Sequence, residues 1–570
     1  MKILGLAAPF GHDSSAALFV DGRVVAAAEE ERFTRKKHAE GQRPINAVKF
    51  CLDQAKLKTS DIDYIAFPWS FKALREKRTE FFLKTICPHP SRAYKKFFLN
   101  NKELRGQNSF IRQTLQACGF DTSGVQIKWI EHHIAHIASS FYLSGMDEAA
   151  VLSMDTGGEI SSTLLGSAKN REIHKIKEIT NPDSLGAFYA TMTDYLGFKR
   201  GNGEYKLMGM APYGEQSKIN FDHIIWWNDK KKTYKCNCDY VWVRRHKRVR
   251  PDKVYSKKMV EEFGPQREGD GLSEPCIHVA AVTQEKLEDI TLRLIDNYLK
   301  DKLKDHNNLC FAGGCALNVS LNRKLIEHPL INNLWVQPAA HDAGTSLGAA
   351  AYVAAQLGEA IEPMKHVYLG PEFTNQQIEE DLRKSGFPFR YENNISEAAA
   401  DLLYKGHVVG WFQGRMEWGP RALGNRSILG NPTIKGTADK INAIIKFREK
   451  WRPFCPSILK EKASEILNSN HPAPFMTTAF KVNPEWKDKV PEVVHVDGTA
   501  RPQVVEKEIN PKFHKVIETF YHKTGIPILI NTSLNRRGEP IVCTPEDALA
   551  MFEGSGLEYL AIGDFLVEKR

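Results

Sequence analysis

Apolar and polar residues at the start of the chain alternate over short runs. Residues 2–6, 14–20 and 23–28 are mostly apolar, and an Asp21-Gly22 turn separates the last two runs. Apolar runs of this length bounded by turn residues predict strands, here a strand, a loop and a hairpin. A further apolar run at residues 149–154 also ends in an acidic, glycine-rich turn, so the strand-to-turn arrangement occurs twice.

Stretches with helical spacing separate these strands. Residues 45–55 and 134–141 have the pattern of helices, and the apolar positions between residues 280 and 303 predict a long amphipathic helix. Residues 309–318 then have the pattern of a strand, a glycine turn and a helix. Strands and helices that alternate in this way, with glycine at the turns, predict an α/β fold.

The pattern breaks at residues 358–373, a stretch with two prolines and two glycines. We expect a linker there, between a domain at residues 1–357 and a second domain at residues 374–570. The second domain opens with a predicted helix at 396–404 and a predicted strand at 407–412. It is therefore expected to be α/β as well.

Composition places the chain among ordinary globular proteins. Its 570 residues are 42% hydrophobic and 26% charged, which is far from the signature of a disordered chain. No stretch approaches the run of about 18 apolar residues needed to cross a bilayer. The ten cysteines are scattered and do not favour a disulfide scaffold. We expect a soluble, cytoplasmic protein with no membrane contact.

The net charge of +9 is unevenly distributed along the chain. Residues 229–258 hold twelve Lys and Arg against three Asp and Glu, and residues 411–455 hold nine against three. The rest of the chain therefore carries a net charge of −6. Alternating apolar residues from Tyr234 to Trp242 predict a β-hairpin in the first stretch. A solvated basic hairpin and a surface for nucleic acid or an anionic acceptor are both open interpretations.

The second basic stretch favours phosphate recognition. Arg421 and Arg452 each stand next to a proline in turn-like sequence, and guanidinium forks suit phosphate oxygens. Arg501 and the polar strand end at Asn531 and Ser533 can add anion and nucleotide contacts. No G-x-x-x-x-G-K-[ST] motif is present, which excludes ordinary P-loop chemistry. A solvated helix face is the expected place of three lysines in this stretch, Lys440, Lys446 and Lys450.

Two histidines stand four positions apart, at His132 and His136. On a helix they would share one face and could chelate one metal ion. Chance gives roughly 0.6 such pairs in a chain with 19 histidines, so packed or capping histidines are the alternative. Asp155 and Asp342 each follow an apolar run in a glycine-flanked turn, where either could be a helix N-cap. Together the four side chains form a nitrogen and oxygen set that suits Fe(II), Mn or Zn.

These motifs occur in a fixed order along almost the whole chain. The sequence carries Phe10-Gly-His12-Asp13, Glu29-Glu-Glu-Arg32, Arg35-Lys36-Lys37-His38, His132-His-Ile-Ala-His136, Met154-Asp155-Thr-Gly-Gly, Met208-Gly-Met-Ala-Pro212, Gly313-Gly314-Cys-Ala-Leu-Asn318, Gly414-Arg-Met-Glu-Trp-Gly-Pro-Arg421-Ala-Leu-Gly-Asn-Arg426-Ser, Arg452-Pro-Phe and Asn531-Thr-Ser533. In this combination the chain resembles the O-carbamoyltransferases of the nodulation and antibiotic-tailoring class, the tobramycin-carbamoyltransferase-like family.

The resemblance implies a fold and an activity. The N-terminal domain would be of the actin, heat-shock-chaperone and sugar-kinase type, similar to the tRNA threonylcarbamoyl-transferase. The smaller C-terminal α/β domain would be similar to the enzyme that makes threonylcarbamoyl adenylate. An enzyme of this family makes carbamoyl adenylate from carbamoyl phosphate and ATP in the C-terminal domain. The metal-binding N-terminal domain then transfers the carbamoyl group to a hydroxyl of a small molecule, such as a sugar, an aminoglycoside or a polyketide.

The resemblance also implies roles for single residues. A metal ion, Fe(II) or another divalent ion, would be held by His132, His136, Asp155 and Asp342. ATP and carbamoyl phosphate would be bound by Arg421, Arg452, Arg501, Asn531 and Ser533. Nucleotide binding in the N-terminal domain would fall to Gly157, Gly158, Gly313, Gly314 and Asn318. The expected catalytic residues are His12 as general base and Lys37, with Lys36 as its rival, for charge on the adenylate.

Two other functions remain open from the sequence. One is tRNA threonylcarbamoyladenosine synthesis, which uses the same two domain types, although nucleic acid is not the expected partner. The other is a non-catalytic, ATP-switched binding protein of the actin or chaperone type, which would leave the C-terminal arginines unexplained. Residues 229–258 carry none of the family's shared motifs, and we predict that they influence the choice of acceptor. The resemblance is compatible with a homodimer.

Overall fold

The chain divides near residue 363. A computed structural model describes residues 1–8, 11–87, 89–98 and 100–569, so Phe10 of the first motif lies outside the described residues. Contacts group residues 1–25 and 43–363 into one unit, unit 1, and residues 26–42 and 364–570 into another, unit 2. The division falls inside the predicted linker, whereas the segment 26–42 groups with the second unit and not with the first.

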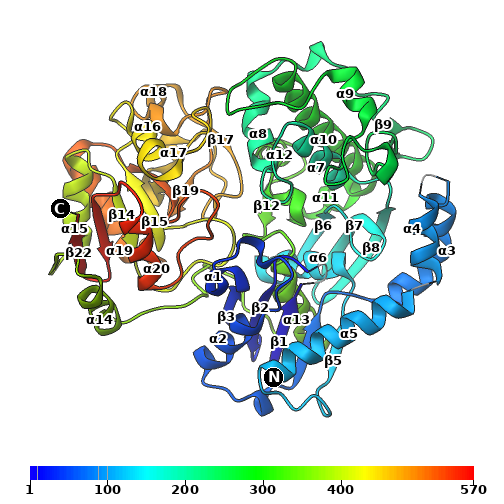
Figure 1. Ribbon diagram of the computed structural model, residues 1–570, viewed down its shortest axis with the longest axis horizontal. Coiled ribbons are helices and arrows are strands. Elements are labelled where there is room, and N and C mark those ends of the chain that lie inside the picture. Colours follow the sequence, from blue (N-terminus) through cyan, green and yellow to red (C-terminus); the bar gives the residue numbers. More distant parts are fainter. Residues whose placement is uncertain (9–10, 88, 99, 570) are drawn as a thin grey trace. The chain divides into compact units, whose positions relative to one another are not determined.

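Unit 1, coloured mostly blue to green in Figure 1, contains two five-stranded sheets with the same strand order. In each sheet the central strand pairs antiparallel with the next strand of its hairpin and parallel with a strand that follows later in the chain. The duplicated order confirms the expected fold of the actin, heat-shock-chaperone and sugar-kinase type. The first sheet, in spatial order, is β3 (Arg23–Glu29), β2 (Ser15–Val20), β1 (Lys2–Ala7), β4 (Tyr64–Phe67) and β5 (Ile127–Trp129), and β3 from Ala26 on groups with unit 2. The second is β8 (Glu172–Thr180), β7 (Ser161–Lys169), β6 (Glu148–Met154), β11 (Asn308–Ala312) and β12 (Asn333–Val336).

Two helices of unit 1 pack against each other and against different sheets. Helix α6 (His132–Ser144) contacts β6 and β11 of the second sheet, and α13 (Gly344–Gln356) contacts β1, β2 and β4 of the first. The helices approach closely at Gly348, where an added Cβ would lie 1.8 Å from the carbonyl oxygen of Ala135. Only glycine fits there, and the close crossing brings the first turn of α6 near the start of α13.

The remaining helices of unit 1 agree with the predicted pattern at some places and not at others. The predicted helix at 45–55 is α2 (Ile45–Ala55), but the single helix expected at 280–303 is two, α10 (Cys276–Tyr298) and α11 (Lys300–His306). The others are α3 (Phe71–Thr85), α4 (Pro90–Phe98), α5 (Asn100–Ala117), α7 (Leu185–Tyr195), α8 (Glu204–Met210), α9 (Lys257–Phe263) and α12 (Val319–Ile326). Among the helices in the described part of the chain, none is both long and apolar enough to span a bilayer.

The basic segment 229–258 contributes only the second strand of a hairpin that is shorter than its alternating pattern predicts. Strand β10 (Thr233–Cys236) pairs with β9 (Ile225–Asn228), and the chain then turns at residues 237–243. Tyr240 is nevertheless buried, because the turn folds its ring inward. Alternation after Cys236 therefore reflects packing of a turn and not an extended strand.

Unit 2 is built on one mixed eight-stranded sheet. Helices α15 (Ile395–Tyr404) and α19 (Pro511–Thr524) pack on each other and on this sheet around the buried rings of Trp411, Phe513 and Phe520. In spatial order the strands are β13 (Phe389–Tyr391), β22 (Phe565–Glu568), β21 (Tyr559–Ile562), β14 (Val409–Phe412), β15 (Arg426–Gly430), β20 (Ile528–Ser533), β16 (Cys455–Leu459) and β19 (Gln503–Val505). The other elements are α14 (Asn375–Ser385), α16 (Thr437–Ile441), α17 (Ala463–Ile466), α18 (Pro484–Lys487), α20 (Pro545–Glu553), and the two-stranded pair β17 (Phe480–Lys481) and β18 (Thr499–Ala500).

The segment 26–42 is tied into unit 2 by polar contacts as well as by packing. The Glu29 carboxylate accepts a hydrogen bond from the Gly419 N–H at 3.0 Å, and Arg32 donates to the Gly419 carbonyl at 2.9 Å. Arg35 donates to the carbonyls of Pro540 and Ile541. Glu29 and Arg32 are buried, so these bonds are shielded from water. The motif Glu29–His38 therefore supports the glycine loop of unit 2 that carries Arg421.

Candidate functional site

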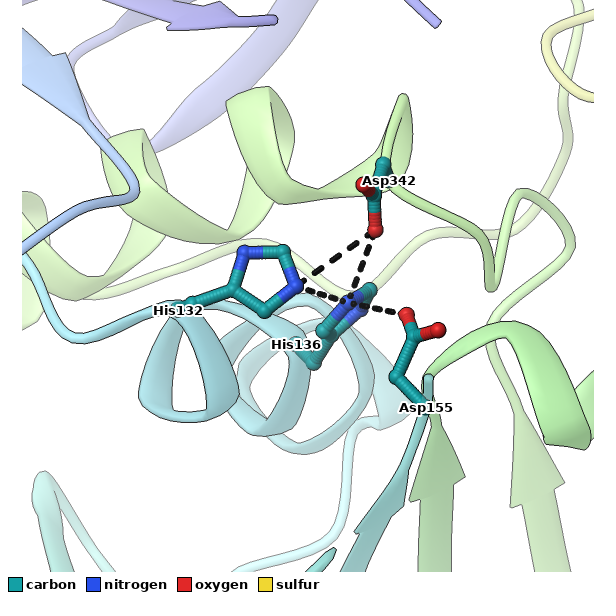
Figure 2. Close-up of side chains that lie close together, drawn as sticks. All are labelled: His132, His136, Asp155 and Asp342. Atoms are coloured by element: carbon teal, nitrogen blue, oxygen red, sulfur yellow. Dashed lines mark hydrogen bonds and ion pairs between the residues drawn. The ribbon is translucent and has the colours of Figure 1, made fainter. Parts of the chain in front are cut away.

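Four side chains of unit 1 converge at one point, and we name them the histidine–aspartate cluster: His132, His136, Asp155 and Asp342. The Nε2 atoms of the two histidines are 3.1 Å apart (Figure 2). His136 Nε2 lies 3.2 Å from Asp155 Oδ2 and 3.5 Å from Asp342 Oδ1, and His132 Nε2 lies 3.4 Å from Asp342 Oδ1. One ligand atom from each residue lies within 4.8 Å of the others. The four residues selected from the sequence are thus brought together.

Local sequence explains how these residues meet. His132 is the first residue of α6, so the spacing of four places His136 one turn later on the same face. Asp155 follows the last residue of β6, and Asp342 lies two residues before α13. Gly158 leaves room for the first histidine, since an added Cβ would lie 3.0 Å from the Cβ of His132. The glycine turn after Asp155 is therefore needed for packing at the cluster.

The charged groups of the cluster shift one another's pKa values. Burial lowers the pKa of His136, but the carboxylates of Asp155 and Asp342 outweigh this effect and raise that pKa to about 9. Burial likewise raises the pKa of Asp342, and the imidazoles of His132 and His136 more than reverse it, so that pKa is well below its usual range. A positive charge is therefore strongly favoured at this point, whether a proton or a cation supplies it.

The donor set and its spacing fit a metal ion. Metal–ligand bonds of about 2.0–2.2 Å place neighbouring ligand atoms roughly 3.0 Å apart in an octahedron and roughly 3.4 Å apart in a tetrahedron. The four spacings above, 3.1–3.5 Å, lie in this range. A nitrogen and carboxylate set also suits a first-row divalent ion. The buried cluster could hold a metal.

A surrounding layer of polar contacts fixes the ligands. His133, the residue after the first histidine, makes contacts outside the cluster: its Nε2 donates to the Ser161 carbonyl at 3.0 Å, and its Nδ1 accepts from Ser153 Oγ at 2.8 Å. The buried carboxylate of Glu159 accepts from the backbone N–H of His132 at 3.1 Å and from that of Ser70. Burial raises the pKa of Glu159. The contacts of His133 and Glu159 thus fix the position of the first turn of α6.

His12 lies at the edge of the cluster, in the loop between β1 and β2. Its Nδ1 is 3.0 Å from Asp13 Oδ2, and its Nε2 is 4.0 Å from Asp342 Oδ2. The hydrogen bond to Asp13 and the charge of Asp342 outweigh burial and raise the pKa of His12 to about 9. The side chain is 44% exposed, so a ligand can reach it.

The glycines and the asparagine predicted for nucleotide binding in unit 1 have packing roles. Gly313 has φ +92°, and an added Cβ would lie 2.2 Å from the Met154 carbonyl oxygen. The N–H of Gly314 donates to Asp155 Oδ2 at 3.3 Å. Asn318 caps α12 and exchanges hydrogen bonds with Gln284 at 2.9 and 3.0 Å. Gly157 is close to Asn181, 2.5 Å from an added Cβ.

Unit 2 contains a second polar centre, which we name the cationic cluster: Lys37, Lys446, Arg448 and Arg452. Burial lowers the pKa of Lys446 well below its usual range, and the charges of Arg448, Arg452 and Lys37 lower it further. The Lys446 ammonium donates to the carbonyls of Ser533 and Asn535 at 2.5 and 3.0 Å and to Asn535 Oδ1 at 2.8 Å. These acceptors are neutral, and the charge of Glu539, which acts in the opposite direction, only partly offsets the lowering of the pKa of Lys446.

The prediction for Lys446 is therefore wrong. It was expected on a solvated helix face, but only 7% of it is exposed, whereas Lys450 is exposed as predicted. The chain closes into a single π-helical turn at Asn442–Lys446, which directs the lysine inward towards the end of β20. No periodicity in the sequence signals such a turn.

The other predicted residues of unit 2 lie around the sheet end. Arg452 Nη1 is 3.3 Å from the buried carboxylate of Glu449. Arg501 Nη2 and Nε lie 2.8 and 3.1 Å from the Cys455 Sγ. Arg421 is half-buried in the loop between Gly419 and Arg426. Lys37 joins Lys446 from segment 26–42, whereas Lys36 is exposed and donates to the Glu40 carbonyl.

Asn531 and Ser533 lie in the C-terminal half of strand β20. Asn531 is 1% exposed and pairs in register with Leu429 of β15 and Cys455 of β16. Ser533 Oγ donates to Asn535 Oδ1 at 2.6 Å and lies 3.3 Å from Lys446 Nζ. The structure thus places Asn531 in the sheet and Ser533 beside the cationic cluster.

One carboxylate that organises this region was not anticipated. Glu417 Oε1 accepts hydrogen bonds from three backbone N–H groups, those of Leu423, Asn425 and Arg426, at 2.8–3.1 Å. It therefore fixes the loop on which Arg421 is presented. Its position just before a glycine-rich, arginine-rich turn is the sequence signal for this role.

Comparison with known proteins agrees with this architecture. Residues 2–351 match the family described as carbamoyltransferase N-terminus, and residues 400–569 match the carbamoyltransferase C-terminus. These domains define an enzyme of the group-transfer class. The chain belongs to the carbamoyltransferase family.

Relatives extend over the whole chain. The nodulation protein NolNO of Sinorhizobium fredii is 35% identical over 100% of this chain and 80% of its own length. An uncharacterized protein of Synechocystis is 36% identical over 100% of this chain and 96% of its own length. Among solved structures, component A of the (R)-2-hydroxyglutaryl-CoA dehydratase of Acidaminococcus fermentans is 13% identical with a TM-score of 0.35 and covers 62% of this chain and 99% of its own.

Proposed function

We propose that the protein is an ATP-dependent O-carbamoyltransferase that forms carbamoyl adenylate in unit 2 and transfers its carbamoyl group in unit 1 to a hydroxyl of a small molecule. The observation that carries the proposal is the match of both carbamoyltransferase domains, in order, on one chain. The two polar centres support it, because one is suited to anionic substrates and the other to a metal ion.

The first half-reaction is the formation of a mixed anhydride. Water cleaves carbamoyl phosphate to carbamate and phosphate; a carbamate oxygen then attacks the α-phosphorus of ATP, and the bond to the β-phosphate breaks to release pyrophosphate. The attack brings together two anions, so cations must offset the charge in the transition state. Lys37, Lys446 and Arg452 supply that charge, and Arg421 and Arg501 are the further guanidinium groups of this site.

The second half-reaction is the attack of an alcohol on the carbamoyl carbon. The acceptor oxygen forms the new bond, the bond between the carbonyl carbon and the AMP oxygen breaks, and AMP leaves. A divalent ion held by His132, His136, Asp155 and Asp342 would polarise the group under attack. We propose Fe(II) as the ion, and Mn and Zn are the alternatives that bind the same nitrogen and oxygen ligands.

His12 is the group that takes the proton of the acceptor hydroxyl. An imidazole must be neutral to do this, yet Asp13 and Asp342 hold the pKa of His12 at about 9 without an ion. A metal ion bound at the neighbouring carboxylate of Asp342 would place positive charge near His12 and lower the pKa of His12.

The acceptor is a hydroxyl-bearing small molecule, such as a sugar, an aminoglycoside or a polyketide. The relative NolNO is named a nodulation protein, which is compatible with a small-molecule acceptor. A cytoplasmic location suits a reaction that consumes ATP and carbamoyl phosphate. A homodimer is compatible with the proposal, and no nucleic acid or membrane is part of it.

The test follows both half-reactions separately. The purified chain is incubated with carbamoyl phosphate and ATP, and pyrophosphate and carbamoyl adenylate are measured; a panel of hydroxyl acceptors is then added and carbamate esters are detected by mass. The proposal requires adenylate formation. His12→Asn should leave that step intact and reduce transfer by about 10²-fold. Near-normal transfer by this variant would mean that His12 is not the base.

The alternatives give different products. Incorporation of labelled threonine into tRNA would replace the proposal by threonylcarbamoyladenosine synthesis. ATP binding without pyrophosphate release under any of these conditions would mean a protein that uses ATP only as a switch. The match of both carbamoyltransferase domains disfavours this second alternative.

A further inference from the structure

Three arginines of unit 1 have no carboxylate partner, and we name them the arginine cluster: Arg200, Arg245 and Arg248. Arg245 and Arg248 belong to the basic segment 229–258, and Arg200 lies in the turn that follows α7. Among the described residues, none of the three forms an ion pair, although other basic side chains of the same region do. The arginine cluster is therefore an excess of positive charge within the basic segment and its surroundings.

The carboxylates of this part of unit 1 already have other partners. Asp194, near the end of α7, accepts hydrogen bonds from Lys253 Nζ at 3.0 Å and from the Val254 N–H at 2.8 Å. Asp239 accepts from Lys247 Nζ at 2.6 Å. Since these acids are occupied, the charge of the arginines remains for a group from outside the protein.

A small hairpin holds Arg248 against the end of α7. Arg248 and Ser256 form an antiparallel bridge, and the hairpin between them is attached to Asp194 by the two hydrogen bonds just described. The ring of Tyr255 packs edge-on against that of Tyr195, with the centroids 5.6 Å apart. Hydrogen bonds and aromatic packing thus fix the backbone that carries Arg248.

The same arrangement brings the three guanidinium groups together. Arg200 follows the end of α7, and Arg245 opens the short 3-10 helix that ends one residue before Arg248. Burial and the charges of Arg200 and Arg245 lower the pKa of Arg248. Arg248 Nε donates to the Val243 carbonyl at 3.1 Å, and this is the only hydrogen bond of that side chain to a described residue. Most of its N–H donors are therefore available to a ligand.

A phosphate group matches this cluster in charge and in shape. Neighbouring guanidinium groups repel one another, so a bound anion lowers the free energy of the arrangement. Each planar guanidinium can donate two parallel hydrogen bonds to oxygens of one anion. Three such groups need at least three acceptor oxygens, which a phosphate monoester offers and a carboxylate does not. The arginine cluster therefore favours a phosphate ester over a carboxylate.

Helix α7 sets the distance between the arginine cluster and the histidine–aspartate cluster. At its start, Ser184 Oγ donates to the Asp155 carbonyl at 3.2 Å, and an added Cβ on Gly186 would lie 2.6 Å from the carbonyl carbon of Asp155. Its other end carries Asp194 and leads to Arg200. The 11 residues of the helix span about 16 Å. The two clusters are therefore roughly one length of α7 apart.

We propose that the arginine cluster binds a phosphate ester of the acceptor, at the end of the molecule remote from the hydroxyl that receives the carbamoyl group. The proposal rests on the proposed function and adds the class of acceptor, an extended, phosphorylated hydroxyl compound such as an oligosaccharide phosphate. The hydroxyl end lies at the histidine–aspartate cluster and the phosphate end at the arginines. A polycationic acceptor, such as an aminoglycoside, is disfavoured because the arginines repel it.

The first experiment tests the phosphate site on the whole chain without any carbamoyl chemistry. Inorganic phosphate is the probe, and the rate at which phenylglyoxal modifies each arginine is followed by peptide mass spectrometry. At ten times the half-saturating phosphate concentration, modification of the three clustered arginines should slow together by about tenfold. Exposed Arg171 of the same unit is the internal control. Sodium chloride at equal ionic strength measures simple screening.

Variants assign the binding to the cluster. Arg248→Gln and Arg200→Gln should each raise the half-saturating phosphate concentration, measured at the remaining two arginines, by about tenfold. Lys230→Gln removes one charge from an exposed position of the same basic segment and should leave that concentration unchanged. Thermal melts identify a variant that fails to fold. The Arg200 side chain makes no hydrogen bond to a described residue, so Arg200→Gln carries the test if Arg248→Gln does not fold.

The second experiment tests the class of acceptor. Wild-type protein with carbamoyl phosphate and ATP is offered a neutral trisaccharide or the same trisaccharide with a phosphate at its reducing end, and carbamate esters are detected by mass. The phosphorylated form should be preferred by about tenfold or more in kcat/KM, mainly through a lower KM. Arg200→Gln and Arg248→Gln should reduce this preference and leave pyrophosphate release unchanged.

Each result supports or overturns one statement. Phosphate protection confined to the three arginines, together with preference for the phosphorylated trisaccharide, supports the proposal. Protection no greater than that of Arg171, or equal protection by sodium chloride, overturns the phosphate site. Equal use of both trisaccharides, or of neither, while pyrophosphate is released, overturns the class of acceptor. A wild-type protein that makes no carbamoyl adenylate overturns the proposed function instead, and the first experiment still decides whether the cluster binds phosphate.

Discussion

The two polar centres of this protein are opposite in charge and are built in opposite ways. The histidine–aspartate cluster gathers acceptors at the ends of regular elements, where α6 begins, β6 ends and α13 is about to begin. The cationic cluster gathers donors from a π-helical turn, a loop and the distant segment 26–42. Centres on element ends can be located from local sequence patterns, whereas centres made from loops depend on the path of the whole chain.

The shifts of pKa show that each centre favours a charge of opposite sign to its own. In unit 1, the carboxylates of Asp155 and Asp342 raise the pKa of His136 to about 9 in spite of burial, so positive charge is favoured there. In unit 2, burial and three neighbouring cations lower the pKa of Lys446, so an anion would restore it. The first centre is therefore prepared for a cation and the second for a phosphate.

The largest effect should come from removing a ligand of the histidine–aspartate cluster. His136→Ala removes one of four ligands, and transfer to the acceptor should fall by about 10³-fold because polarisation at the carbamoyl group is lost. A chelator should do the same to the unmodified protein, with recovery on adding back Fe(II). Carbamoyl adenylate formation, measured as pyrophosphate release, should persist. Its loss in the same variant would mean that the two centres do not act separately.

The second largest effect should come from removing a charge of the cationic cluster. Lys446→Met removes a buried positive charge and leaves the Ser533 and Asn535 carbonyls without their donor. Pyrophosphate release should fall by about 10²-fold because less charge is offset in the transition state. Lys450→Met, at an exposed position a few residues away, is the matched control and should keep normal rates. Equal rates for both variants would remove Lys446 from the mechanism.

A smaller and more selective effect is expected from the basic segment of unit 1. Several of its charges are already paired, as in Lys235 with Asp183 and Lys253 with Asp194. Replacing Arg244, Arg245, Arg248 and Arg250 by serine should leave adenylate formation unchanged and alter transfer several-fold for some acceptors only, measured by competition between acceptors. Loss of adenylate formation would show that this segment does not simply select the acceptor.

The smallest effect concerns stability in unit 2. Burial and the charge of Arg415 lower the pKa of His366, so the folded protein resists a proton that the unfolded chain accepts. Stability is therefore lost as pH falls below about 6.5. In urea unfolding at about pH 5.5 and about pH 7.5, His366→Gln should reduce this loss by less than about 1 kcal/mol. His522→Gln, at an exposed position, is the control; an equal change in both variants would contradict the assignment.

Local patterns were enough for much of unit 1. The strand at the N-terminus, the helix at 45–55 and the spacing of His132 and His136 follow from periodicity, because side chains four apart share a helix face whatever the helix packs against. The helix predicted at 280–303 is α10 as far as Tyr298, and α11 continues from Lys300, so only its single, unbroken course was wrong. Leu299 between them keeps the helical spacing of the apolar side chains. Periodicity reports which residues are buried, and it does not report where a helix ends.

Residues of the candidate site that belong to ordered sequence motifs could be predicted. Whether a residue is buried or exposed could not. Lys446 has the sequence surroundings of a surface lysine, and only the π-helical turn directs it inward. Gln503 is buried without any local sequence signal, because its side chain is held by a hydrogen bond to the Leu423 carbonyl, 80 positions away in the sequence. A buried polar side chain acquires its role from the partners that replace water, and these are long-range.

What the sequence by itself determined is the chemistry available to this protein: imidazoles and carboxylates at element ends in one half, arginines and polar strand ends in the other. Only the tertiary structure decided that segment 26–42 belongs to the second half and that Lys446 and Asn531 are buried. The physical reason is that helix and strand spacing act over a few residues, whereas desolvation and hydrogen-bond direction are set by residues that fold from hundreds of positions away.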